Sequence, residues 1–416
     1  MNIWLHYLLG MLGLCGLAWL YSEQRRSIPI GIVVKAWALQ IALTWLCVKF
    51  APVHDLLSAF NSILVAIETA TRAGTTLVFG FLGGGDAPYI ATAPANGFVL
   101  AFQALPMVLV MSALSALLFH WRVLPALVRA FSTVVQKMIG VGSTVSIAAS
   151  VNVFVGMVEA PLLIKPWLAH LDRAQLLMIM TTGLATIAGT VMALYASFIA
   201  AVVPDAFGHL MAASVISVPG AVLFSAILIP PGGDPGGTDR ILLKSPHRNT
   251  MDAITQGTLD GLQLLLNIIA MLVVLVALVT LVNLLLGQIE WHGQALSLQR
   301  LLSPLMRPLA WMAGVSWEQS EVAGDLLSTR LVINELVAYL DLAALAPESL
   351  SASNRLIMSY ALCGFANFAS LGILIGGLGA MIPERRDEVL ALTGRALFGA
   401  TLATLSCGAA VGLLSA

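Results

Sequence analysis

One apolar stretch of this chain reads VNVFVGMVEAPLLI over residues 151–164, and it carries an amide, a carboxylate and a Gly/Pro break. A second stretch, LVINELVA over residues 331–338, has the same kinds of polar group. Ionisable side chains are costly at membrane depth and therefore mark a substrate or ion path. Two broken, carboxylate-bearing segments in the two halves of one chain predict a midplane binding site in a secondary transporter.

The composition places the chain in a membrane. It is 59% hydrophobic and 10% charged, with a mean hydropathy of +0.93. In a soluble domain about 25% of the residues are charged. The net charge of −1 gives no indication of a nucleic-acid partner, and membrane lipid is the surrounding medium that we expect.

Eight stretches meet the requirement for a spanning helix, about 20 mostly apolar residues. They are 3–21, 28–49, 97–119, 175–203, 208–229, 261–288, 352–380 and 389–414. Two more apolar stretches, 141–170 and 316–346, are interrupted by Gly, Asn and Glu, and we expect each to be a re-entrant hairpin. Its non-helical backbone must be satisfied by protein or by a water-filled cavity. Three amphipathic stretches, 52–76, 120–138 and 296–313, are expected to lie in the membrane interface.

The order of these elements repeats. A hairpin, a broken span and another span occupy 141–229, and the same three elements occupy 316–416. The two hairpins start from opposite faces, so the repeat is inverted, an architecture that transporters use for alternating access. Residues 1–140 are expected to form scaffold and interfacial helices, and 230–315 a cytoplasmic connector, a long scaffold helix and an interfacial helix. The predicted fold class is an all-α membrane protein with eight transmembrane helices, two re-entrant hairpins and interfacial helices.

Lysine and arginine residues indicate the orientation of the chain. With both termini outside and the hairpins not crossing, the basic clusters at 240–248 and 385–386 lie inside. This agrees with the excess of Lys and Arg found in cytoplasmic loops. We therefore expect a multi-pass membrane protein with both termini on the outer side.

Several ordered motifs resemble those of the concentrative nucleoside transporter family, from about residue 75 to the C-terminus. They are FQALP at 102–106, SVNVFVG at 150–156, EAPL at 159–162, MTTGLATIAGT at 180–190, LKSP at 243–246, NE at 334–335 with VAY at 337–339, and SYALCGFANF at 359–368. The resemblance implies a homotrimer that imports nucleosides by an elevator-type mechanism driven by a sodium gradient. It also implies that the first hairpin and first broken span hold the nucleobase, while the second pair hold the ribose.

The ribose site implied by the resemblance consists of Glu335, Asn367 and Ser370, with Phe365 packing against the nucleoside. An ionised carboxylate accepts hydrogen bonds, which sugar hydroxyls donate. The alternative for Glu335 is a buried structural ion pair, for which Arg330 is the nearest candidate in sequence. The alternative for the two polar side chains of the broken span is satisfaction of loose backbone.

The nucleobase site implied by the resemblance consists of Gly156, Met157, Val158, Glu159 and Val191. Family members usually have Gln and then Thr after the hairpin glycine, whereas this chain has Met and then Val. An unpaired group at a desolvated site costs about 1–3 kcal/mol, so base specificity is expected to differ from the familiar pyrimidine pattern. An unusual nucleoside such as pseudouridine is one candidate; the alternative role for the methionine and Val191 is core packing.

The sodium site implied by the resemblance consists of Asn152, Val155, Thr186 and Ile187. The amide and hydroxyl oxygens suit a hard cation, and the apolar residues would supply backbone carbonyls where helices are broken. A proton-coupled transporter would instead need a titrating group, for which Glu159 and Glu335 are candidates.

Other functions remain as alternatives. The same fold could carry another small polar solute, since fold does not fix function, and a channel is a second alternative. The string Gly83–Asp86 matches a short motif of some intramembrane aspartyl proteases. No span offers a convincing second aspartate, so we do not expect an enzyme.

Overall fold

The computed structural model describes residues 2–89, 97–157, 159–232, 246–291 and 294–415. Within these ranges the chain is helical apart from turns and one short antiparallel pair of strands. The predicted all-α fold class is confirmed, and the strand pair is a small addition to it.

The described elements fall into four groups along the chain. The first group is α1 (Ile3–Leu20), α2 (Ile30–Val48), α3 (Ala51–Phe79), η1 (Gly80–Gly83), α4 (Leu100–Gln103), α5 (Met107–His120) and α6 (Val123–Ile139). The second is α7 (Ser143–Asn152), α8 (Glu159–Leu163), α9 (Lys165–Leu168), α10 (Arg173–Ala185), α11 (Gly189–Ile199) and α12 (Ala206–Leu228). The third is α13 (Thr250–Leu286), β1 (Glu290–Trp291), β2 (Gln294–Ala295) and α14 (Leu298–Met312). The fourth is η3 (Trp317–Gln319), α15 (Ser320–Val332), α16 (Glu335–Ala344), α17 (Ala352–Ala361), α18 (Phe368–Met381), η4 (Pro383–Arg385) and α19 (Arg386–Ser415).

Among the described residues, eight helical stretches are long and apolar enough to cross a membrane. Seven coincide with predicted spans. The broken span predicted at 352–380 is divided into α17 and α18, and α18 is a shorter apolar helix of 14 residues. The helices α6 and α14 match two of the expected interfacial segments and contain 17 and 15 residues.

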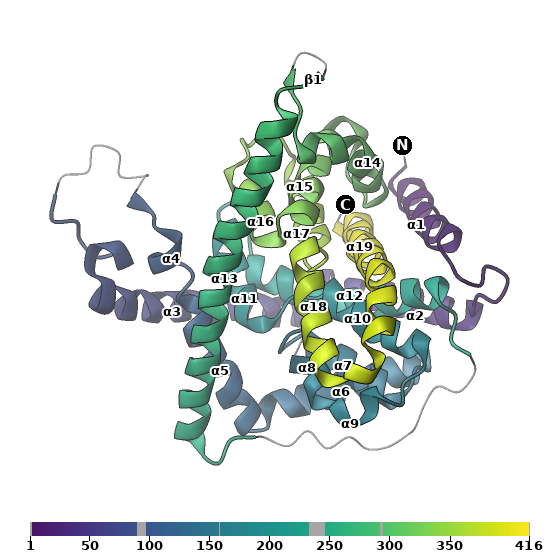
Figure 1. Ribbon diagram of the computed structural model, residues 1–416, viewed down its shortest axis with the longest axis horizontal. Coiled ribbons are helices and arrows are strands. Elements are labelled where there is room, and N and C mark those ends of the chain that lie inside the picture. The colour runs from purple at the N-terminus through teal and green to yellow at the C-terminus, as the bar shows by residue number, and fades with distance from the viewer. Residues whose placement is uncertain (1, 90–96, 158, 233–245, 292–293, 416) are drawn as a thin grey trace.

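The eighth candidate span differs from the prediction. The segment 52–76 is expected in the interface, but α3 continues to Phe79, and the stretch Asn61–Gly83 is long and apolar enough to cross a membrane. The difference arises because Leu77, Val78 and Phe79 extend the apolar run beyond the expected end. Figure 1 shows α3 running transverse to the long helix α13, a direction typical of an interfacial helix.

Both predicted hairpins turn back within the protein. Helix α7 packs against α8, and α15 packs against α16. Helices α7 and α15 contain 10 and 13 residues. At 1.5 Å per residue they are roughly 15 and 20 Å long, shorter than the apolar layer of about 30 Å. Neither α7 nor α15 is therefore long enough to cross a membrane.

The breaks in the two interrupted helices lie against each other. A Cβ atom added at Gly364, between α17 and α18, would lie 3.0 Å from the carbonyl oxygens of both Leu184 and Ala185 at the end of α10. Such contacts are tighter than side chains tolerate, so glycine permits this approach of two backbones. The inverted repeats therefore meet at their points of interruption.

Backbone groups freed at the breaks find partners within the protein. The amide of Gly189, at the start of α11, donates to the carbonyl of Phe154 in the first hairpin turn at 3.2 Å. The guanidinium of Arg330 donates to the carbonyl of Ala361 at the end of α17, with an Nη1–O distance of 2.6 Å. Each hairpin thus contributes to satisfying the broken helix beside it, as membrane depth requires.

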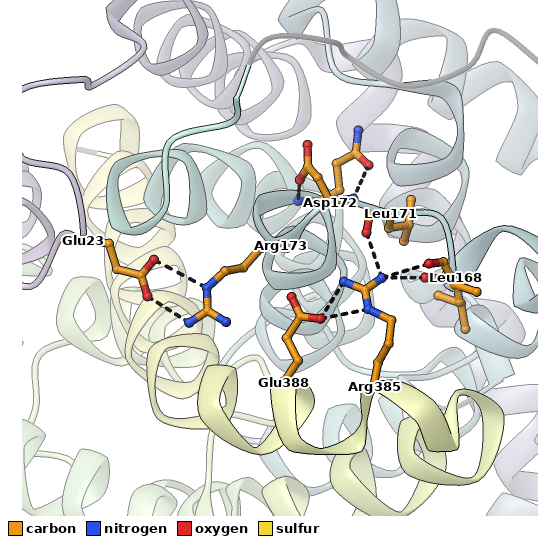
Figure 2. Close-up of polar contacts among 9 residues, drawn as sticks. Glu23, Leu168, Leu171, Asp172, Arg173, Arg385 and Glu388 are labelled. Atoms are coloured by element: carbon orange, nitrogen blue, oxygen red, sulfur yellow. Dashed lines mark hydrogen bonds and ion pairs between the residues drawn. The ribbon is translucent and has the colours of Figure 1, made fainter.

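Arginine side chains join the repeats at one end of the molecule (Figure 2). Arg385 donates to the carbonyls of Leu168 and Leu171, beyond the first hairpin, at 3.0 and 2.7 Å. Arg173, the first residue of α10, donates to Glu23 in the loop after α1 at 2.9 Å. This hydrogen bond holds the pKa of the Glu23 carboxyl below its ordinary value. The two repeats and the end of α1 are therefore linked.

A second unit consists of α5 and α13, which pack closely against each other. A Cβ atom added at Gly257 of α13 would lie 2.7 Å from the Cβ of Ala116 and 2.8 Å from the carbonyl oxygen of Ser112. Small residues let helix backbones approach in this way in membranes.

We expect Gly257→Ala to lower the melting temperature of the detergent-solubilised protein, because overpacking costs about 1–3 kcal/mol. Gly74→Ala is the matched control, since no atom lies within 4 Å of its added Cβ. Alanine is favoured over glycine in a helix by about 1 kcal/mol, so the control should keep or raise the melting temperature. Equal melting temperatures for the two variants would contradict the close packing of α5 and α13.

Candidate functional site

The turn of the second hairpin places a carboxylate in the protein interior. The side chain of Asn334 caps α16 by accepting from the amide of Val337 at 3.0 Å. Glu335 is therefore the first helical residue, and only 4% of its surface is exposed. A negative charge at this end of a helix is stabilised by the helix dipole.

Two neutral side chains donate to the Glu335 carboxylate, one to each oxygen. The amide nitrogen of Asn367 lies 2.6 Å from Oε2, and the hydroxyl of Tyr195 lies 2.7 Å from Oε1. The other end of the Asn367 amide caps α18 by accepting from the amide of Ser370 at 2.8 Å. Glu335 and Asn367 are thus in direct contact, the backbone amide of Ser370 is linked to them through Asn367, and α11 of the first repeat joins them.

Arg330 is not the ion-pair partner of Glu335. Its Nη1 donates to the carbonyl of Ala361 and to the hydroxyl of Thr404, at 2.6 and 2.9 Å. The ion pairs found among the described residues do not include Arg330 with Glu335. The structural ion-pair alternative for this carboxylate is therefore not supported.

The carboxylate of the first hairpin, Glu159, faces a cavity of about 570 Å³. The cavity lies between that hairpin and the α5–α13 pair, and Val155, Thr190 and Asp260 also line it. Gly156 has a φ of +151°, and a Cβ atom there would collide with the Glu159 carboxylate. Glycine at this position therefore leaves room for the acidic side chain.

Both glutamates lie beside the same helix, α11. Glu159 shares the cavity with Thr190, and Glu335 accepts from Tyr195. Thr190 and Tyr195 are five positions apart, which corresponds to a rise of roughly 7.5 Å along a helix. The structure thus gives one open and one enclosed acidic position along α11.

The apolar residues expected at the nucleobase are largely buried. Met157 and Val191 are 7% and 4% exposed. Met157 packs against α10, because a Cβ atom at Gly183 would lie 3.1 Å from the methionine Cβ. Phe365 is half-buried in the second break, and its carbonyl accepts from the amide of Asn367 at 2.9 Å. Val158 lies outside the described residues.

The residues expected at sodium include an unsatisfied amide. Neither polar atom of the Asn152 side chain has a hydrogen-bond partner among the described residues, and the residue is 1% exposed. Its Nδ2 would lie 3.7 Å from a Cβ at Gly183, one turn before Thr186. Thr186 is extended where α10 ends. Val155 and Ile187 lie in the adjoining turn and break, so the donor set fits a small hard cation.

Sequence reasoning missed Tyr195 and the α13 side of the cavity. A buried tyrosine hydroxyl usually has a partner, so a tyrosine within the apolar helix α11 was an available signal. Asp252, Gln256 and Asp260 recur every four residues along α13, which places them on one face of that helix. All three line the cavity.

Family models match along the chain. Residues 9–82 match the N-terminal model and residues 209–412 the C-terminal model of Na⁺-dependent nucleoside transporters, and residues 101–202 match a nucleoside-recognition gate model. An uncharacterised transporter of Haemophilus influenzae is 33% identical over 98% of this chain and 96% of its own length. The nucleoside permease NupC of Helicobacter pylori is 32% identical over 97% of this chain and 96% of its own length.

Solved structures of one nucleoside transporter, CNTnw, are similar to this chain over nearly its whole length. The transporter CNTnw in an inward-facing, substrate-bound state has a TM-score of 0.88 and 34% identity, covering 99% of this chain and 98% of that one. An outward-facing variant of CNTnw has a TM-score of 0.90 and 33% identity over the same shares. The resemblance expected from the motifs is confirmed. The protein is a membrane transporter, not an enzyme, and it belongs to the concentrative nucleoside transporter family of the Na⁺-dependent type.

Proposed function

We propose that the protein imports nucleosides and is driven by a sodium gradient. The observation that carries this proposal is the buried carboxylate of Glu335, which accepts from two neutral side chains and takes part in none of the ion pairs found among the described residues. A carboxylate has about four lone-pair positions, so acceptor capacity remains for the hydroxyls of a sugar. The substrate-bound state of CNTnw supports a substrate site in this fold.

In this proposal the ribose binds at Glu335, Asn367 and Ser370, with Phe365 against the nucleoside. The nucleobase binds at Gly156, Met157, Val158, Glu159 and Val191. The open cavity at Glu159 supplies the route by which a nucleoside reaches both groups of residues. Because Met157 and Val158 follow the hairpin glycine, the base is recognised by apolar packing or through bridging water molecules. The preferred base therefore differs from that of family members with Gln and Thr at these positions.

Sodium, rather than a proton, is the proposed coupling ion. The buried side-chain oxygen of Asn152 has no hydrogen-bond donor in the part of the chain that the structure describes, and such an atom is costly unless a ligand supplies a partner. Thr186, Val155 and Ile187 would complete the oxygen shell. Coupling requires that bound sodium favours the form of the protein that binds nucleoside.

The proposed transport movement is of the elevator type, along the face between the α5–α13 pair and the two repeats. Tight packing holds α5 to α13, while the links of Figure 2 hold the repeats together. Helices α1 and α2 pack against α12 and α19, which favours their association with the repeats despite their position in the predicted 1–140 scaffold part. The cavity lies on the same face.

A homotrimer in a bacterial inner membrane is the proposed assembly. Helix α13 presents exposed apolar side chains, among them Val273, Leu284 and Leu285, which lipid or neighbouring copies would cover. Both termini are proposed to be periplasmic, and Figure 1 shows both of them in the half of the molecule away from the start of α13.

We expect Glu335→Ala to abolish nucleoside uptake in proteoliposomes while the melting temperature and oligomer size stay close to wild type. The acceptor of the sugar hydroxyls is lost, and hydrogen bonds to charged groups contribute about 1.5–3 kcal/mol each. Uptake at the wild-type rate would contradict the ribose role of this residue.

Removal of the Asn152 side-chain amide should remove the stabilisation of the protein by sodium. Asn152→Leu is expected to abolish the rise in melting temperature that sodium, compared with choline, gives the wild-type protein. Thr181→Val is the matched control, because it also removes a buried hydrogen-bonding atom without a partner. The control should keep the sodium response, and a response that survives in Asn152→Leu would place the ion elsewhere.

The double variant Met157→Gln with Val158→Thr tests whether these two side chains determine which nucleobase is preferred. It restores two polar groups at positions where most family members have them. We expect its ranking of nucleosides, measured by competition for uptake, to shift toward pyrimidine nucleosides. An unchanged ranking would show that these two side chains do not contact the base.

A further inference from the structure

Tyr195 connects the two repeats at the centre of the site. Its hydroxyl comes from α11 of the first repeat and lies 2.7 Å from Oε1 of Glu335 in the second repeat. The tyrosine is 3% exposed, and its ring packs against that of Tyr339 with centroids 5.3 Å apart. The hydroxyl of Tyr339 is directed elsewhere, donating to the carbonyl of Ser359 at 2.8 Å.

The carboxylate of Glu335 is fixed from both sides. Asn367 donates to one oxygen and Tyr195 to the other. The terminal torsion of a glutamate is broad, so a carboxylate held at only one oxygen can turn. Two donors on different oxygens define its plane and leave acceptor capacity on each oxygen.

We propose that Tyr195 is a positioning residue that sets selectivity for the cis-diol of ribose. It orients Glu335 so that each carboxylate oxygen accepts one of the two neighbouring sugar hydroxyls. The inference rests on the proposed ribose role of Glu335. It adds that discrimination between ribonucleosides and 2′-deoxynucleosides depends on a residue of the first repeat.

Tyr195 is the better position to test, because its hydroxyl donates to Glu335 and does not cap a helix. Asn367 also caps α18, so its replacement disturbs the helix as well as the carboxylate. Tyr195→Phe removes one oxygen atom and keeps the ring and its packing. Without the tyrosine hydroxyl, the carboxylate can turn toward a lone sugar hydroxyl. The affinity for a deoxynucleoside should therefore fall less than the affinity for a ribonucleoside.

The experiment is isothermal titration calorimetry of the purified full-length protein in sodium. The ligands are uridine with 2′-deoxyuridine, and adenosine with 2′-deoxyadenosine. Tyr195→Phe should weaken binding of the ribonucleosides about tenfold, the loss expected for a hydrogen bond to a charged group. Binding of the deoxynucleosides should weaken less. The ratio of the deoxynucleoside dissociation constant to that of the matching ribonucleoside should therefore move toward one.

Tyr339→Phe is the matched control, since it removes a buried hydroxyl from the neighbouring ring without touching Glu335. Its ratio should equal that of the wild-type protein. A wild-type ratio in Tyr195→Phe overturns the positioning role, as does an equal change in both variants. Glu335→Gln separates the two proposals: wild-type ribonucleoside affinity in that variant overturns the ribose site itself, whereas lost affinity leaves only Tyr195 in question.

Discussion

Backbone that is not helical at membrane depth must find its hydrogen-bond partners inside the protein. In this structure the two interrupted helices and the two hairpins meet that requirement for each other. Phe154 of one hairpin accepts from the start of α11, and Arg330 of the other donates to the end of α17. Gly364 then lets the two breaks touch. The hairpins therefore cannot leave the breaks without exposing unpaired backbone to an apolar medium.

The same constraint explains where the acidic groups lie. A buried carboxylate needs donors, and Glu335 has them from both repeats, through Tyr195 and Asn367. Glu159 instead faces a cavity whose other wall belongs to the α5–α13 pair. One carboxylate thus belongs to the packed centre of the repeats, whereas the other lies at the boundary with the rest of the protein.

Much of this arrangement could be predicted from the sequence. Gly, Asn and Glu within apolar stretches predicted the hairpins, and the family resemblance predicted that Glu335 and Asn367 would meet. The hydrogen bond of Tyr195 could not be predicted, because hydrophobicity around the whole of α11 hides which side meets the other repeat. The role of Arg330 was missed because closeness in sequence does not give the direction of a side chain. The extent of α3 was missed because its apolar run continues past the last charged residue, Arg72.

The difference in openness around the two glutamates has a consequence for nucleoside analogues. If the sugar occupies the enclosed position at Glu335, bulky substituents on its hydroxyls meet packed protein on every side. The cavity beside Glu159 has a volume of about 570 Å³, which leaves free space beyond a base bound there. Antimetabolites and fluorescent reporters that enter cells through this carrier should therefore bear their modifications on the heterocycle.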